Sequence, residues 1–199
     1  MRILVVSASG TLGSAICREL DPRHEIVAAG RTSGDERVDV EDFASIQTLY
    51  SRVGTVDAVV SALGHVHFGP LADMTPDLMA VGIRNKLMGQ VNLVLAGTPH
   101  VADGGSFTLI SGILAHDPIK LGTSASLVNG AIESFVEAAS IELPRAIRIN
   151  AVSPGVFIES MEGYGPYFRG HKPVAVADAA LAFAKSVEGL RTGQIFAVF

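Results

Sequence analysis

Short, almost continuously apolar runs alternate along the chain with longer segments in which apolar residues recur at three- and four-residue steps. The short runs are typical of buried strands, and the longer segments are typical of helices with one apolar side. The pattern predicts strands at 3–6, 26–29, 38–40, 56–61, 106–111, 147–152 and 194–198. It predicts helices at 12–20, 42–53, 77–97, 123–143 and 175–188, with an irregular Gly-, Pro- and aromatic-rich segment at 154–173.

This alternation favours one parallel sheet with helices on both faces, because each crossover between parallel strands carries a helix. The chain has no internal repeat, low-complexity tract or linker. We therefore predict an α/β fold, a doubly wound parallel sheet in three α/β/α layers, formed by a single domain over 1–199. The run 194–198 is expected to form an edge strand.

Composition narrows the choice of partner and compartment. Twenty acidic and 15 basic residues give a net charge of −5, and the chain has no basic run. Nucleic acid and anionic membranes are therefore not expected as partners. No apolar stretch approaches the roughly 18 residues that a membrane span needs. The single cysteine, Cys17, excludes a disulfide framework, and the N-terminus lacks a cleavage site. We expect a cytoplasmic protein with a small-molecule ligand.

The turn after the first predicted strand, Ser7–Gly13, has the sequence Ser-Ala-Ser-Gly-Thr-Leu-Gly and opens a helix. Backbone N–H groups at a helix N-terminus favour an anion, and glycine lets a pyrophosphate approach the backbone closely. Gly10 and Gly13 meet two of the three glycine positions of a dinucleotide-binding loop. An ordinary strand-to-helix turn is the alternative interpretation.

The second predicted strand is followed by Arg31, Thr32 and Ser33. Dinucleotide sites that recognise a free ribose carry an acidic residue there, whereas a guanidinium suits the 2′-phosphate of NADP(H). We therefore predict NADP(H) as the preferred cofactor, with NAD(H) as the alternative. An exposed loop arginine without a ligand is the competing interpretation.

Six segments, in order and at similar spacing, resemble the short-chain dehydrogenase/reductase family over nearly the whole chain. They are Ser7–Gly13, Asp39-Val40, Ser61–Gly64, Gly104–Ser111, Arg148–Gly155 and Thr192–Gln194. The segment Arg148–Gly155 is the most specific of them, and its Pro-Gly turn usually lies beside the nicotinamide in relatives.

The resemblance implies a Rossmann-like fold and an NADP(H)-dependent reductase or dehydrogenase of a small carbonyl or alcohol compound. It also implies a homodimer or homotetramer. The implied cofactor-binding residues are Ser7, Ser9, Gly10, Thr11, Leu12, Gly13, Arg31, Thr32, Ser33, Asp39, Val40, Ser61, Ala62, Gly64, Pro154, Gly155 and Val156.

The family's proton donor is usually a tyrosine whose pKa is lowered by a lysine four residues later on one helix face. The segment Gly130–Phe135 resembles the sequence that follows the family's lysine, and this sets the register. Asn129 then stands at the lysine position and Ala125 at the tyrosine position. No tyrosine lies between Tyr50 and Tyr164, so a shifted alignment does not restore the pair.

The other two catalytic positions also depart from the family pattern. The serine position falls on Gly112, with Ser111 one residue earlier, where strand alternation turns a side chain to the opposite face. The asparagine position falls on Lys86. We therefore predict an exchange, in which Lys86 returns an ammonium to the site from the opposite helix and Asn129 hydrogen-bonds the nicotinamide ribose. A solvated Lys86 and a neutral, inactive Asn129 are the alternative.

A replacement proton donor is harder to identify. His116, followed by Asp117, is the best candidate because imidazole titrates near neutrality, although this dipeptide is also a common turn feature. His65 and His67 have no third ligand, so we expect no metal site. Two functions stay open: a reductase with the non-standard catalytic residues Ser111, Lys86, Asn129 and His116, or a non-catalytic NADP(H)-binding sensor, scaffold or partner subunit.

Overall fold

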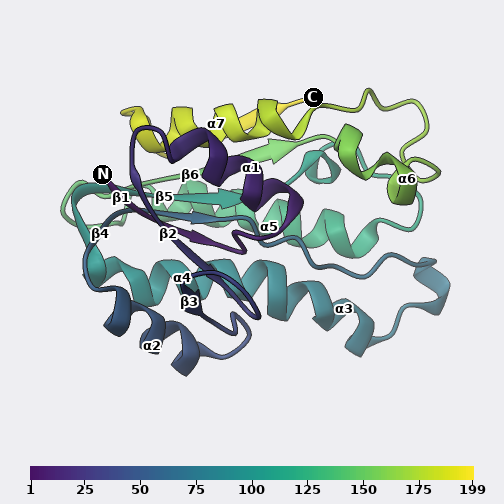
Figure 1. Cartoon of the computed structure of the whole chain (residues 1–199). Coiled ribbons are helices and arrows are strands. Elements are labelled where there is room, and N and C mark those ends of the chain that lie inside the picture. The colour runs from purple at the N-terminus through teal and green to yellow at the C-terminus, as the bar shows by residue number, and fades with distance from the viewer.

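The computed structural model describes residues 1–199 and contains one sheet of seven parallel strands. Their spatial order is β3-β2-β1-β4-β5-β6-β7 (Figure 1). Strands β2 and β3 are added on one side of β1 and strands β4 to β7 on the other, so the strand order reverses between β1 and β4. The strands are β1 (Arg2–Val6), β2 (Glu25–Gly30), β3 (Glu36–Arg37), β4 (Val56–Ser61), β5 (Val101–Ile110), β6 (Arg148–Pro154) and β7 (Ile195–Val198). The predicted α/β fold is confirmed, and β7 lies at the predicted edge.

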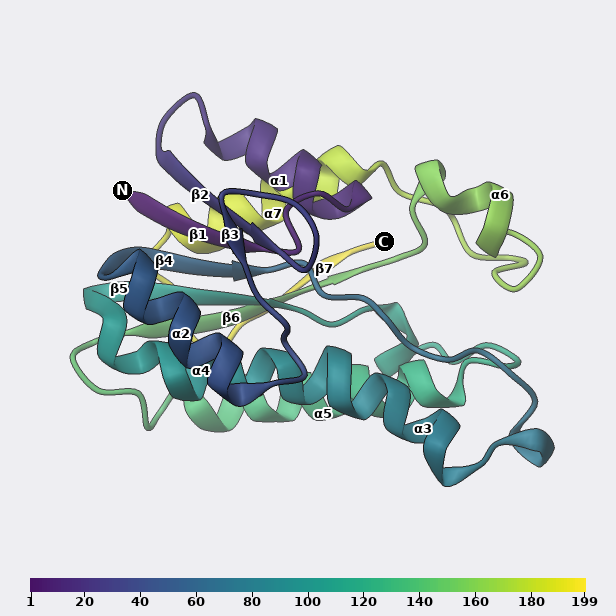
Figure 2. The same ribbon diagram turned by 60° about the horizontal axis from the view of Figure 1, so that its bottom comes forward.

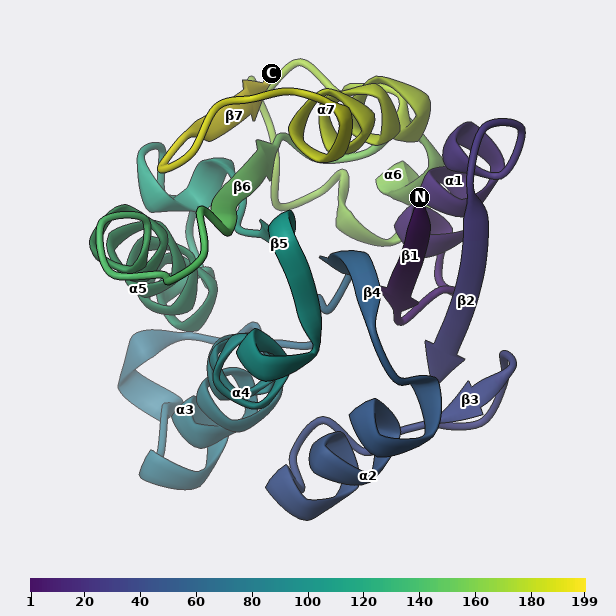
Figure 3. The same cartoon turned by 90° about the vertical axis from the view of Figure 1, so that its left-hand side faces the viewer.

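Helices cover both faces of the sheet, as Figure 3 shows almost end-on. Helices α1 (Thr11–Leu20) and α7 (Val176–Glu188) pack on one face, and α2 (Phe43–Val53), α4 (Gly89–Gly97) and α5 (Thr123–Ala139) on the other. Side chains alternate along each strand. Ile3 and Val5 therefore join the core under α1 and α7, whereas Leu4 and Val6 join the core under the other three helices.

The predicted helix 77–97 is a continuous coil with a rare turn in its middle. Helix α3 (Pro76–Gly82) starts with Thr75 as its N-cap, and the π-helical turn η2 (Ile83–Met88) connects it to α4. A π-turn widens the helix and is often found at functional sites. Lys86 is the buried residue of this turn.

Three predicted elements differ substantially from the structure. The helix expected at 123–143 ends four residues earlier, because α5 stops at Ala139. Residues 38–40 do not form a strand, because β3 consists of Glu36 and Arg37 alone. The backbone N–H of Asp39 instead bonds the Ser45 hydroxyl as the chain turns into α2, while the apolar Val38 and Val40 remain buried. The strand β5 begins at Val101, five residues earlier than predicted, with a register shift against β4.

The carboxyl ends of the parallel strands β1, β4, β5 and β6 lie at the same edge of the sheet. Helix α3 and the short helix α6 (Met161–Tyr164) extend beyond the sheet on that side, where Figure 2 shows them on opposite sides of the opening. The segment predicted to be irregular, 154–173, supplies α6. A crevice at the carboxyl ends of strands whose order reverses is the usual ligand position in this architecture. None of the helices combines the length and the apolar composition that a membrane span needs.

Candidate active site

Two adjoining cavities lie at the carboxyl edge of the sheet. The first has a volume of about 220 Å³ and extends from Leu12 to Lys86 and Asn129. The second, of about 230 Å³, is lined by Ser7, Arg31 and other residues at the ends of β1 and β2. Leu63 and Gly64 line both cavities. The two cavities therefore adjoin at the end of β4.

The loop between the cavities has the backbone geometry of a phosphate cradle. A Cβ atom at Gly13 would stand 2.1 Å from the Ser7 carbonyl oxygen, so this position accepts only glycine. Ser7 has φ of 66°, a conformation that glycine adopts more readily. No side chain caps the N-terminus of α1, so the first N–H groups of that helix remain for an anion.

The second cavity carries one ion pair at its edge. Arg31 Nη2 lies 3.0 Å from Asp39 Oδ2, and 74% of the Arg31 side chain is exposed. Both residues line the cavity, together with Val40 and His65. Thr32 and Ser33 do not line it. The guanidinium is therefore anchored by a carboxylate, and most of its surface remains free to meet a phosphate.

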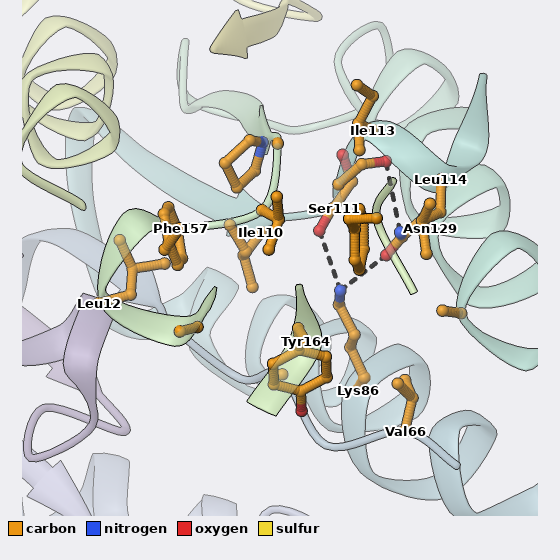
Figure 4. A pocket seen from close by; sticks show the side chains of 18 of the residues that line it. Leu12, Val66, Lys86, Ile110, Ser111, Ile113, Leu114, Asn129, Phe157 and Tyr164 are labelled. Atoms are coloured by element: carbon orange, nitrogen blue, oxygen red, sulfur yellow. Dashed lines mark hydrogen bonds between the residues drawn. The ribbon is translucent and has the colours of Figure 1, made fainter. Parts of the chain in front are cut away.

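The first cavity contains the pair that the predicted exchange concerns (Figure 4). Lys86 Nζ donates to Asn129 Oδ1 at 2.7 Å and to the Ser111 carbonyl oxygen at 2.9 Å. Asn129 Nδ2 donates to the Gly112 carbonyl oxygen at 3.3 Å. Both side chains are buried, so Lys86 is not the solvated lysine of the alternative interpretation. The structure brings Lys86 from η2 and Asn129 from α5 to one point.

The backbone around Lys86 is held by a buried glutamine. Gln90 Nε2 donates to the carbonyl oxygens of Lys86 and Ile110, and its Oε1 accepts from the Ile110 N–H at 2.8 Å. These three bonds attach the π-turn to the end of β5. The position of the ammonium is therefore set by the sheet as well as by its own helix.

Lys86 has an unusual charge environment. Burial lowers its pKa from 10.5 to about 8, and the negative charge of Glu133 opposes that fall. An ammonium carries three N–H donors, and two of them are used by Asn129 and Ser111. The third has no acceptor in the protein, and Lys86 lines the cavity. A ligand oxygen in the cavity is the natural partner for it.

A second chain of contacts leads from Ser111 to the surface. Ser111 Oγ donates to Glu133 Oε1 at 2.6 Å, and Glu133 Oε2 lies 2.7 Å from His116 Nε2. Glu133 is buried, whereas 61% of the His116 side chain is exposed. The hydroxyl of Ser111 thus points to Glu133 while its carbonyl faces Lys86. Neither His116 nor Glu133 lines the cavities.

Most of the other residues that line the first cavity are apolar. Phe68 packs edge-on against Tyr164 with ring centroids 5.6 Å apart, and it stacks on Tyr167 at 6.3 Å. Lys86 is the only charged residue among the 21 that line the cavity. The chain places no group of three His, Cys, Asp or Glu side chains where they would hold a metal ion.

Comparison with known proteins decides the family. The family model described as enoyl-(acyl carrier protein) reductase matches residues 21–198. The chain belongs to the short-chain dehydrogenase/reductase family. It is thus a member of a family of oxidoreductases.

Curated relatives in this family are distant. A putative ketoacyl reductase 2 of the granaticin polyketide synthase from Streptomyces violaceoruber is 24% identical over 81% of this chain and 74% of its own length. Versicolorin reductase from Emericella nidulans is 29% identical over 69% of this chain, which spans 54% of that relative.

Two solved structures have the same overall fold as this chain. The protein lin1944 from Listeria innocua is 50% identical, with full coverage of both chains and a TM-score of 0.99. A small-chain dehydrogenase solved in complex with NADPH is 22% identical over 100% of this chain and 96% of its own, with a TM-score of 0.89. The latter likeness shows the shared fold.

Most of the predicted site residues lie along the two cavities. The first is lined by Leu12, Ala62, Gly64, Lys86, Ser111, Asn129, Pro154, Gly155 and Val156, and the second by Ser7, Arg31, Asp39, Val40 and Gly64. Ser61 is buried at the end of β4 without a partner for its hydroxyl. Ser9 and Gly10 lie in the exposed loop between β1 and α1, and Thr11 is the exposed first residue of α1.

Sequence reasoning missed Glu133, Gln90 and the wall residues Phe68 and Phe168. Glu133 stands four residues after Asn129 on the same helix, so its spacing was a usable signal for a buried polar partner. The sequence around Gln90 and around the two phenylalanines contains no motif that would indicate a site residue. Gln90 and Phe168 are brought to the site by contacts between distant segments.

Proposed function

We propose that this protein is an NADP(H)-dependent reductase of small carbonyl compounds, in which Lys86 and Asn129 replace the family's usual polar pair. The observation that carries the proposal is the buried ammonium of Lys86 in the first cavity, with two of its three N–H groups committed to Ser111 and Asn129. A buried charge is costly unless it is paired and fully hydrogen-bonded, and a ligand oxygen at the third N–H group would reduce that cost.

The cavities support a dinucleotide as cofactor. The uncapped start of α1 and the close packing at Gly13 fit a pyrophosphate, and Arg31 fits a 2′-phosphate. The related small-chain dehydrogenase was solved with NADPH. NAD(H) is the alternative, because Asp39 beside Arg31 is also placed to accept from ribose hydroxyls. When bound, the nicotinamide supplies a hydride to the carbonyl carbon.

The chain's own residues then have distinct tasks. Asn129 and the Ser111 carbonyl orient the ammonium of Lys86, and its free N–H hydrogen-bonds the substrate oxygen or a ribose hydroxyl. With a pKa of about 8, the ammonium is largely protonated at neutral pH. A positioned proton donor contributes about 10²–10⁴-fold to such a reaction.

The cavity's lining indicates the kind of substrate. Ala125 and Gly112, at the family's tyrosine and serine positions, leave apolar space beside Lys86. Phe68, Tyr164 and Phe168 line that space. An uncharged carbonyl compound with an apolar body matches this lining. The cavity offers an anionic substrate one cation, Lys86, among mostly apolar side chains.

One observation favours a second candidate function. Ala125 and Gly112 provide no hydroxyl at either position where the family uses one. A non-catalytic NADP(H)-binding protein, such as a sensor or partner subunit, needs the phosphate loop and Arg31 but no proton donor. The fate of the bound cofactor separates the two candidates.

The test begins with calorimetric titration of NADPH and NADH into the purified protein. Tight NADPH binding and weaker NADH binding are expected. NADPH oxidation is then followed with a panel of uncharged aromatic and aliphatic aldehydes, ketones and quinones, using wild type and Lys86→Met. Turnover that falls in the variant supports the reductase. Tight binding without turnover supports the binding protein, and no binding of either nucleotide overturns both.

We also propose a homodimer or homotetramer. An apolar groove between the outer sides of α4 and α5 is lined by Leu95, Phe135 and Leu143, and the Leu95 side chain is exposed. A second copy of the chain is the partner that the resemblance implies. Light scattering behind size-exclusion chromatography gives the mass, and a monomer of 20.8 kDa would contradict this proposal.

A further inference from the structure

Ser111 connects two charged groups that do not touch each other. Its carbonyl oxygen accepts from Lys86 Nζ at 2.9 Å, and its hydroxyl donates to Glu133 Oε1 at 2.6 Å. All three residues are buried. A buried carboxylate is unfavourable unless opposite charge or hydrogen-bond donors compensate it. Glu133 accepts a hydrogen bond from Ser111 and contacts His116 Nε2 at 2.7 Å, and Lys86, on the other side of Ser111, is the only buried cation of the chain.

We propose that Glu133 is a positioning residue for Lys86. Glu133 holds Ser111 by its hydroxyl, so that the Ser111 carbonyl oxygen accepts from the Lys86 ammonium. The carboxylate of Glu133 also supplies the buried counter-charge of Lys86. His116 fixes this carboxylate from the solvent side. The inference deepens the proposed function, because it explains how the chain keeps an ammonium charged in an apolar cavity without the family's tyrosine.

The surroundings of the carboxylate and the ammonium support this assignment. His116 and Asp117 follow the short helix η4 (Ile113–Ala115), and Asp117 Oδ2 lies 3.6 Å from His171 Nδ1. Tyr164 of α6 lines the cavity with Lys86. The negative charge of Glu133 raises the pKa of Lys86, whereas burial lowers it.

A purely structural role for Glu133 is the competing explanation. In that case its hydrogen bond to Ser111 and its contact with His116 merely attach α5 to the end of β5 and to the segment after η4. Loss of the carboxylate would then lower stability but leave the titration of Lys86 unchanged. The titration of Lys86 therefore separates the two roles.

The experiment follows each lysine side chain by NMR in the cofactor-free protein with isotope-labelled lysine. The chain has four lysines, Lys86, Lys120, Lys172 and Lys185, and Lys86→Met assigns the signal of interest. Glu133→Gln keeps the shape of the side chain and removes its charge. We expect the pKa of Lys86 to fall by about one unit or more, because loss of a nearby opposite charge disfavours the ammonium. The midpoint of Lys185 stays unchanged as the internal control.

Further variants sharpen the result. Glu133→Asp retains the charge, so the Lys86 midpoint should lie between wild type and Glu133→Gln. If Glu133→Gln does not fold, His116→Ala provides the test, because a carboxylate released toward water should lower the Lys86 midpoint in the same direction by a smaller amount. A folded variant whose Lys86 midpoint equals that of wild type overturns the inference.

The outcome is independent of turnover. If NADPH does not bind, the proposed function fails while the NMR titration still tests the link between Glu133 and Lys86. If turnover is observed, the pH profile of kcat/KM should move to lower pH in Glu133→Gln together with the Lys86 midpoint. Turnover with an unmoved profile and an unmoved midpoint retains the reductase and rejects the role of Glu133.

Discussion

The two cavities differ in what builds them. The phosphate loop and the second cavity depend on backbone groups: the free N–H groups of α1, the close approach at Gly13 and the turn at Ser7. The first cavity depends on side chains from separate elements, with Lys86 on η2 and Asn129 on α5. Backbone geometry ties a function to one sequence position, whereas an ammonium can arrive at the same point from either of two facing helices.

We expect the largest effect from a change in the backbone of the loop between β1 and α1. Gly13→Ala introduces a Cβ that would lie 2.1 Å from the Ser7 carbonyl oxygen, so the loop must shift. We expect NADPH affinity to fall by at least about 100-fold, equivalent to about 2.8 kcal/mol, and unfolding free energy to fall by about 1–3 kcal/mol. Calorimetry and chemical denaturation measure the two effects.

Gly130→Ala is the matched control for this change. A Cβ at Gly130 in α5 meets no atom within 4 Å. Alanine in a helix is favoured over glycine by about 0.5–1 kcal/mol, so this variant should be at least as stable as wild type and bind NADPH equally. An equal loss of affinity in both variants would contradict the phosphate-cradle interpretation of Gly13.

We expect the next largest effect from the side chains of the first cavity. Lys86→Met should lower kcat/KM by about 10²–10⁴-fold, as expected for loss of a proton donor or orienting cation. The exchanged variant Lys86→Asn with Asn129→Lys places the ammonium on α5, as in the family pattern, and should recover at least about tenfold over the worse single variant because neighbouring sites are coupled. Additive losses in the double variant would show that the two residues act separately.

A smaller effect concerns stability and pH. Folding lowers the pKa of Lys86 from 10.5 to about 8, so the unfolded chain binds the proton more tightly between these values. Stability from this group therefore rises as pH increases from about 8 to 10.5, by at most about 3 kcal/mol. Denaturation of wild type and Lys86→Met at both pH values isolates the contribution. A difference between the two proteins that is constant with pH would show that Lys86 has an ordinary pKa.

The smallest effect concerns cofactor choice. Arg31 is mostly exposed, so its contact with a phosphate is screened by solvent and salt. Arg31→Ala should reduce the preference for NADPH over NADH by about tenfold, or about 1.4 kcal/mol, with little change in NADH affinity. The exposed Arg84, which is paired with Glu41 at 3.7 Å, gives the matched control Arg84→Ala. An unchanged preference in Arg31→Ala would assign the selectivity to other residues.

Several features of the fold were predictable from the sequence because they depend on local pattern. The strand at 56–61 and the helices near 43–53 and 176–188 match the apolar periodicity within one residue at each end. The strand expected at 38–40 is wrong for a tertiary reason. Its valines are buried, but beyond Arg37 only the Val38 N–H continues the pairing, to the Gly30 carbonyl oxygen of β2 at 3.1 Å, before the backbone turns to begin α2.

The sequence alone determined the alternating fold and the glycine loop after β1, because periodicity and spacing are properties of neighbouring residues. The exchange of residue types at positions 86 and 129 was predicted from the resemblance to the short-chain dehydrogenase/reductase family. Only the tertiary structure decided that Lys86 and Asn129 meet at 2.7 Å and that Ser111 divides its two oxygens between Lys86 and Glu133. A π-turn, a strand end and a facing helix produce those contacts together, and no segment of the sequence contains all three.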